Sequence, residues 1–116
     1  MGENHIATAL AYGGEGHDII YGADDSATVV IYGDKDYGYG IGSSLTTGGK
    51  DKIYGGDNNA SVTIYGEADD DKIWTGSENT VIVVYGDSDC LGGGTDCHGD
   101  DIITVEDAND NVTVYG

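Results

Sequence analysis

Short apolar runs, each followed by glycine, recur along the whole chain at a nearly constant interval. These marker positions are separated by 9 to 11 residues, except at two steps of 22 and 20 residues. A repeat this short cannot bury an apolar face by itself, so successive repeats must stack on one another. The two long steps contain residues 34–48 and 87–99, which we expect to be inserted loops. The markers are Gly13, Gly22, Gly33, Gly55, Gly66, Gly76, Gly86 and Gly116, with Glu106 in the equivalent position.

Two types of half-turn alternate along the chain. The first type has an aspartate two residues before an isoleucine, as in Asp18 with Ile20, and the second has a longer β-branched run without that aspartate. Strand side chains point alternately to the two faces, so the isoleucines should point into a core. The same holds for Val29, Ile31, Val62, Ile64, Ile82, Val84, Val112 and Val114 of the longer runs.

Two half-turns make one coil of about 20 residues, and stacked coils place their strands side by side in parallel. The sequence therefore predicts an all-β fold, a parallel β-solenoid of about four to five coils. Two facing sheets would enclose the core, and residues 1–116 would form a single domain with the two inserted loops. Polar residues at one shared position of the second half-turn should form a hydrogen-bonded ladder along one edge; they are Ser26, Asn59, Asn79 and Asn109.

The charge of the chain excludes several classes of partner. Four lysines and no arginine stand against 22 acidic residues, which gives a formal net charge of -18. Binding to nucleic acid or to an anionic membrane surface depends on clustered basic residues, so neither is expected. No apolar stretch is long enough to cross a membrane, so no membrane insertion is expected. The predicted core is small for this length, and a bound metal or an assembly partner should contribute to stability.

The aspartates of the first half-turn give the strongest chemical signal. Stacking should place Asp18, Asp51, Asp71 and Asp101 in one column, with like charges about 5 Å apart that repel by roughly 1 kcal/mol per pair even in water. A cation between them would reverse that cost. Calcium suits such a column because it accepts six to eight oxygen ligands in flexible geometry, and glycine-rich turns expose carbonyl oxygens. The alternative is that the aspartates only form turns.

The segment Gly13–Tyr21 has the spelling G-G-x-G-x-D-x-U-x, the nonapeptide pattern of calcium-binding β-helices. It resembles the RTX (repeats-in-toxin) β-roll family. The resemblance implies a β-roll that binds Ca²⁺, is secreted and folds outside the cell, by an export route that needs no cleaved N-terminal signal. The metal residues that it implies beside the four aspartates are Gly13, Gly16, Gly49, Gly66, Asp69 and Gly99.

The chain departs from the family pattern in two ways. The full motif occurs once, and the third copy has Asp69 where the other copies have glycine. The alternate half-turns lack the aspartate, so we expect metal at one edge only and side-chain hydrogen bonds at the other.

The two cysteines lie within the second loop with six residues between them. Cys90 and Cys97 are expected to form a local disulfide if the protein is extracellular. A zinc site that combines them with Asp96 and His98 is the alternative.

Aromatic residues precede most of the marker glycines. They should point outward and stack into two ladders, either as a surface cover or as a ligand face for sugar rings or another protein. One ladder contains Tyr12, Tyr32, Tyr65, Tyr85 and Tyr115, and the other contains Tyr21, Tyr54 and Trp74.

The sequence contains no recognisable catalytic motif, so we do not expect an enzyme. The leading expectation is a calcium-stabilised extracellular module with a structural or adhesive role. One alternative is a face that binds polysaccharide or ice, although the outward column of Val30, Thr63, Val83 and Thr113 lacks the regular threonines expected for ice. The other alternative is a subunit that stacks end to end into filaments, because strand edges at the two ends would remain open.

Overall fold

The computed structural model describes residues 8–14, 16–26, 28–33, 49–67, 70–87 and 99–115. These residues form strands joined by turns, with no helix among them, and therefore none that could cross a membrane. The strands are β1 (Thr8–Tyr12), β2 (Ile19–Tyr21), β3 (Thr28–Tyr32), β4 (Lys52–Tyr54), β5 (Ser61–Glu67), β6 (Lys72–Trp74), β7 (Val81–Asp87), β8 (Ile102–Thr104) and β9 (Asn111–Tyr115).

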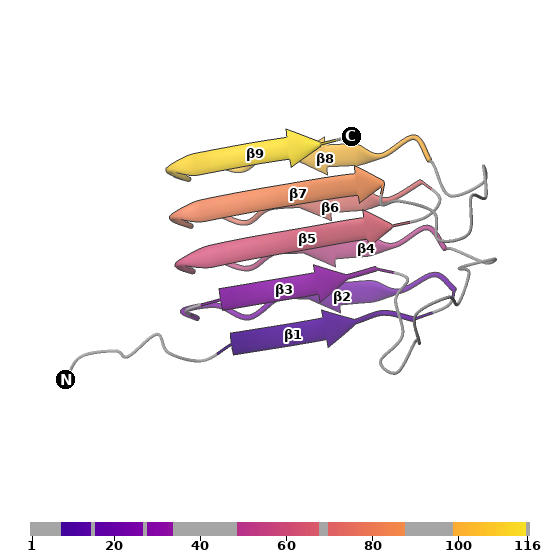
Figure 1. Cartoon of the computed structure of the whole chain (residues 1–116), viewed down its shortest axis with the longest axis horizontal. Helices are drawn as coiled ribbons and strands as arrows, with labels where there is room; N and C mark the ends of the chain where they lie inside the picture. The colour runs from indigo at the N-terminus through magenta and orange to yellow at the C-terminus, as the bar shows by residue number, and fades with distance from the viewer. Residues whose placement is uncertain are drawn as a thin grey trace.

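Successive strands alternate between two sheets that lie face to face (Figure 1). The odd-numbered strands form a five-stranded sheet in the order β1-β3-β5-β7-β9, and the even-numbered strands form a four-stranded sheet in the order β2-β4-β6-β8. All seven strand pairs are parallel. The prediction of an all-β fold with two parallel sheets is confirmed.

The register confirms the spacing of the repeat. Thr8 of β1 pairs with Thr28 of β3, which is a step of 20 residues, and Ser61 pairs with Val81 by the same step. Thr28 pairs with Ser61, so this step contains 13 additional residues, and the step from Val81 to Asn111 contains 10. The strands therefore keep their alignment across both insertions.

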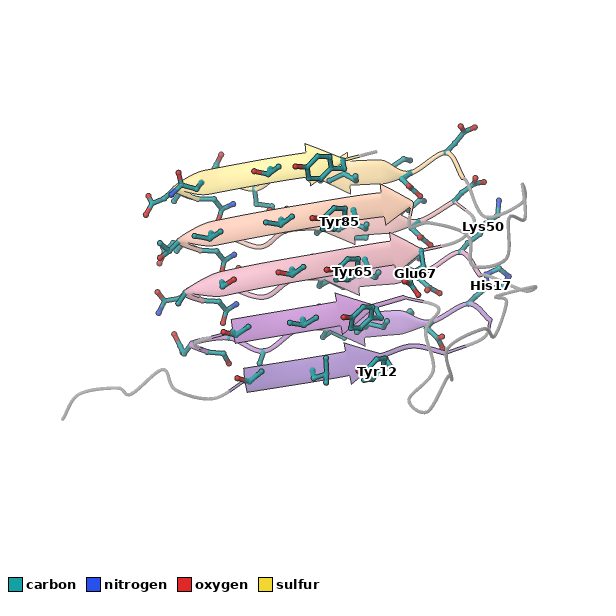
Figure 2. The ribbon with its side chains drawn as sticks, viewed as in Figure 1. Tyr12, His17, Lys50, Tyr65, Glu67 and Tyr85 are labelled. Carbon is teal, nitrogen blue, oxygen red and sulfur yellow. The ribbon has the colours of Figure 1, made fainter. Side chains whose placement is uncertain are left out.

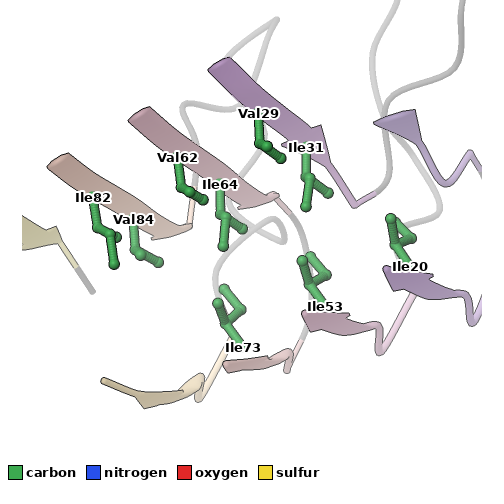
Figure 3. Close-up of a cluster of buried hydrophobic side chains, with 9 residues drawn as sticks. All are labelled: Ile20, Val29, Ile31, Ile53, Val62, Ile64, Ile73, Ile82 and Val84. Carbon is green, nitrogen blue, oxygen red and sulfur yellow. The ribbon is translucent and has the colours of Figure 1, made fainter. Parts of the chain in front are cut away.

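The core fills the space between the two sheets (Figure 3). Side chains of the five-stranded sheet face those of the four-stranded sheet, because alternate residues of every strand point to the same side. Nine of the predicted inward residues are buried: Ile20, Val29, Ile31, Ile53, Val62, Ile64, Ile73, Ile82 and Val84.

Burial is wrongly predicted at the last strand. Val112 and Val114 of β9 are 37% and 41% exposed, and Ile103 of β8 is only partly buried. β9 and β8 are the outermost strands of their sheets, so a neighbouring strand covers each of them on one side only. The inward side chains of these two strands are therefore less covered than those of the central strands.

Several predicted features lie outside the described residues. They are loop 34–48, almost all of loop 87–99, Asp69 and the group of Cys90, Asp96, Cys97 and His98. Of the second loop, Asp87 belongs to β7 and Gly99 is described.

Candidate metal site

The four aspartates form a column along one edge of the structure. Each lies directly before a strand of the four-stranded sheet, and the carbonyl oxygens of the first three accept a hydrogen bond from the first residue of the next strand in the stack. The N···O distances are 2.9 Å from Lys52 to Asp18, 2.9 Å from Lys72 to Asp51 and 2.8 Å from Ile102 to Asp71. The parallel pairing therefore aligns Asp18, Asp51, Asp71 and Asp101, as the sequence predicted.

One carboxylate oxygen of each later aspartate holds the main chain of the aspartate before it. The amide of Asp18 donates to Oδ1 of Asp51 at 2.8 Å, and the amide of Asp51 donates to Oδ1 of Asp71 at 2.9 Å. The amide of Asp71 donates to Oδ1 of Asp101 at 2.9 Å. Bonds from an amide to a charged oxygen are stronger than neutral ones, so this ladder ties successive repeats together.

The second carboxylate oxygen points into the interior. Oδ2 of Asp18 and Oδ2 of Asp51 are buried and accept no hydrogen bond within the described part of the chain. Asp51 is only 1% exposed, so water outside the structure cannot solvate this oxygen. Leaving a buried carboxylate oxygen without a donor or cation is costly.

A row of glycines makes room for these oxygens. A Cβ atom at Gly13 would lie 2.9 Å from Oδ2 of Asp18, and one at Gly33 would lie 2.6 Å from Oδ2 of Asp51. At Gly66 the corresponding distance to Oδ2 of Asp71 is 2.5 Å. Any larger residue would fill the corner into which the carboxylates project. Glycine is therefore required at these positions because a side chain would collide with Oδ2, and not because the backbone turns there.

The environment of Asp51 is reflected in its pKa. Burial raises the pKa of Asp51 from 3.8 to about 6, and the negative charge of Asp18 adds to the rise. The hydrogen bond from the Asp18 amide and the proximity of His17 oppose it. The neutral form of this carboxyl therefore persists to a higher pH than that of an exposed aspartate, and a nearby cation would favour the ionised form.

The donor set fits a hard cation only if main-chain oxygens take part. Among the described residues, no group of three or more His, Cys, Asp or Glu side chains is arranged to hold a metal ion. One or two carboxylates with carbonyl oxygens of the glycine-rich turns remain as candidate ligands, and such an all-oxygen set suits Ca²⁺.

The predicted turn glycines occupy different positions relative to the column. Gly13 and Gly66 line the corner beside the carboxylates. Gly16 has a φ of 105° and stacks so closely on Gly49 that a Cβ at Gly49 would collide with the Gly16 carbonyl. Gly99 is half-buried just before Asp100 and Asp101. These glycines therefore allow close stacking of successive turns.

A second, outward column at this edge was not predicted. The Lys50 amide donates to Nδ1 of His17 at 2.8 Å, and the Asp100 amide donates to Oδ1 of Asp70 at 2.7 Å. The Lys50 ammonium also pairs with Oδ2 of Asp70 at 2.7 Å. These bonds hold the pKa of Asp70 below its ordinary value, the Asp100 amide being the larger cause. Figure 2 shows His17 and Lys50 at this edge. The residues of this second column directly precede the column aspartates in the sequence, and this shared position could have predicted the column. They are His17, Lys50, Asp70 and Asp100.

Glu67 is another residue that the sequence reasoning missed. It closes β5 with a φ of 85° and is 6% exposed. Its charge contributes to the raised pKa of Tyr32, after burial and the neighbouring Tyr12. Its position directly after a marker glycine gave no hint of burial.

The predicted polar ladder is present at the opposite edge. The amides of Ser26, Asn59 and Asn79 donate to Oδ1 of the next asparagine at 2.8, 2.8 and 2.9 Å. Nδ2 of Asn79 donates to the carbonyls of Gly56 and Thr75, and Nδ2 of Asn109 donates to those of Gly76 and Glu106. Nδ2 of Asn59 is buried and has no such partner among the described residues.

The predicted aromatic ladders are also present. Ring centroids of successive residues lie 4.7 to 5.1 Å apart with planes within 8° of parallel. Figure 2 shows Tyr12, Tyr65 and Tyr85 one above another on the five-stranded sheet. Because each ring face covers the next, mainly ring edges point outward. The ladders are Tyr12-Tyr32-Tyr65-Tyr85-Tyr115 and Tyr21-Tyr54-Trp74.

No protein-family model, curated protein or solved structure matches the chain. A functional proposal for this protein therefore depends on the geometry of the aspartate edge.

Proposed function

We propose that this chain is a calcium-stabilised β-roll, a parallel β-solenoid similar to those of the RTX family, with a structural or adhesive role outside the cell. The single observation that supports it most is the buried Oδ2 of Asp51, which accepts no hydrogen bond among the described residues. A calcium ion would supply the positive charge that this oxygen lacks. Extracellular calcium is plentiful, so the module would be stable where it acts.

The role proposed for the protein is non-enzymatic. Among the described residues, stacking accounts for the glycines at the aspartate edge, and cation binding would account for the buried carboxylates. A structural or adhesive module needs only a rigid fold that forms under the right conditions. Calcium-dependent folding supplies such a condition.

The aromatic ladders give less support to sugar binding. Stacking of a sugar on an aromatic side chain requires an exposed ring face, whereas the observed rings cover one another. End-to-end stacking of subunits stays a prediction, and concentration-dependent light scattering with and without calcium tests it.

Far-ultraviolet circular dichroism with a thermal melt tests the proposed function. The protein is first treated with chelator and then titrated with calcium, with magnesium as the control ion. We expect calcium to raise the melting temperature by at least 10 °C and magnesium to have a much smaller effect, because magnesium requires a tighter octahedron. A melting temperature that calcium leaves unchanged would contradict the proposal.

A further inference from the structure

The outer face of the five-stranded sheet carries no charged side chain in the rows that all five strands share, although the chain has a formal net charge of -18. The parallel register aligns three outward rows, and each of their residues is half-buried or exposed. We call these rows the uncharged face. They are Thr8, Thr28, Ser61, Val81 and Asn111; Leu10, Val30, Thr63, Val83 and Thr113; and the ladder Tyr12, Tyr32, Tyr65, Tyr85 and Tyr115.

The rest of the described surface is charged. Lys52 and Lys72 are exposed on the outer face of the four-stranded sheet, and the carboxylates of Asp24 and Asp57 are exposed in turns at the amide edge. Charged groups lose favourable hydration when a partner covers them, and like charges then repel more strongly. Among the described residues, the uncharged face is therefore the sheet face on which two copies can meet without desolvating a charge.

The uncharged face is flat. Adjacent tyrosine rings of its third row lie within 8° of parallel, whereas adjacent strands of an ordinary sheet are rotated by about 20 to 25°. Figure 2 shows Tyr12, Tyr65 and Tyr85 in line across this face. A flat face with straight rows of side chains can pack against an identical face over its whole width.

The size of the face sets the strength of such a contact. Five strands about 4.8 Å apart, with five shared residues that each rise about 3.3 Å, give a footprint of roughly 400 Å². Because side chains protrude from this plane, two copies would bury on the order of 1,000 Å² in total, the lower limit for a specific interface. Such a pair is weak and reversible.

We propose that two copies of this chain pair through the uncharged face, sheet against sheet, about a twofold axis. The same patch is used by both copies, so the assembly closes at two. Apolar and tyrosine side chains are removed from water in this contact, and tyrosine is enriched in such interfaces. Thr63 lies in the middle row of the middle strand, so it faces Thr63 of the second copy. The pairing goes beyond the proposed role of calcium and does not depend on it.

Sedimentation velocity at a fixed calcium concentration and increasing protein concentration tests the pairing. We expect a monomer–dimer equilibrium with a dissociation constant of about 10 to 100 µM in about 0.15 M salt. Raising the salt from about 0.05 M to about 0.5 M should tighten pairing at least fivefold, because salt screens the repulsion between two acidic copies. A contact formed by ion pairs would weaken instead.

Thr63→Glu and Thr104→Glu are matched variants. Each replaces an outward threonine and adds one negative charge, but Thr104 belongs to β8 of the other sheet. We expect Thr63→Glu to weaken pairing at least tenfold, because two carboxylates would meet in the contact. Thr104→Glu should weaken it less than about twofold. Circular dichroism checks that both variants are folded.

Mixing variants separates pairing from folding. Thr63→Lys should also fail to pair with itself, since two ammonium groups would meet. An equimolar mixture of Thr63→Lys and Thr63→Glu should pair at least as tightly as the natural sequence, because opposite charges then face each other. Mixing cannot repair a variant that has lost its fold.

Several outcomes would overturn the inference while leaving calcium stabilisation intact. A protein that stays monomeric at about 1 mM in about 0.5 M salt has no such contact. Growth beyond two copies indicates end-to-end stacking instead. Equal pairing by Thr63→Glu and the natural sequence, or a mixture that stays monomeric, excludes a twofold contact through Thr63. Retention on an insoluble neutral polysaccharide without self-association assigns the face to a different ligand.

Discussion

The two edges of the structure carry the same main-chain ladder with different side chains. At both edges the amide of one repeat donates to Oδ1 of the next, at 2.8 to 2.9 Å. The two edges differ in the second terminal atom of the side chain, which is Nδ2 in asparagine and Oδ2 in aspartate. Asn79 uses Nδ2 to donate to two carbonyls, whereas Oδ2 of Asp51 cannot donate in its ionised form. The comparison teaches that the asparagine group completes the stacked edge at Asn79 and Asn109, whereas the ionised aspartate group has no donor to offer, so that a cation would be needed to compensate Oδ2 of Asp51.

Replacing asparagine by aspartate at the amide edge, the edge that carries the ladder of Ser26, Asn59, Asn79 and Asn109, should have the largest effect on stability. Asn79→Asp would place a carboxylate oxygen against the carbonyls of Gly56 and Thr75, at a site that is 1% exposed. We expect the free energy of unfolding to fall by about 3 kcal/mol or more at pH 7. Chemical denaturation measures it, and calcium should not restore the loss. Full recovery in calcium would mean that the two edges are equivalent.

The pH dependence of the calcium-free protein should have the opposite sign from that of an ordinary salt-bridged carboxylate. Because the pKa of Asp51 is raised from 3.8 to about 6, the folded protein holds a proton that the unfolded chain has released. Its contribution to stability is complete below about pH 4 and is lost as the pH rises through 6.

We expect this contribution to be on the order of 1 to 2 kcal/mol after allowance for solvent screening. Denaturation in chelator at pH 4.5 and pH 7 measures it, with Asp51→Asn as the control in which the decline should be smaller. An equal decline in the control would assign it to other groups.

The smallest effect is expected where a carboxylate faces solvent. Asp57 lies in an exposed turn at the amide edge, where its Oδ1 accepts the Ser77 amide at 2.7 Å. Asp57→Asn retains that acceptor, so we expect a change within about 0.5 kcal/mol and the same stabilisation by calcium as in the natural sequence. Loss of the calcium effect in this variant would place the ion away from the aspartate column.

Much of this arrangement follows from the sequence, because strand spacing and alternation fix which residues meet. The steps between glycines predicted the parallel pairing, and the shared position of Ser26 and Asn59 predicted the amide ladder. The orientation of the second oxygen of Asp51 was less predictable, since it depends on the space left beside Gly33 once the repeats are stacked. The bond from the Lys50 amide to His17 joins residues on either side of residues 34–48, and the pair of the Lys50 ammonium with Asp70 depends on where an exposed side chain points.

The most direct test of the central claim is the free energy of unfolding of the natural sequence and of Asp51→Asn, each in chelator and in calcium. In chelator the variant should be more stable by about 1 to 3 kcal/mol, because an amide replaces a buried carboxylate and keeps the Oδ1 acceptor. Calcium should stabilise the natural sequence and have clearly less effect on the variant. A variant that is less stable in chelator and gains as much from calcium would contradict the account.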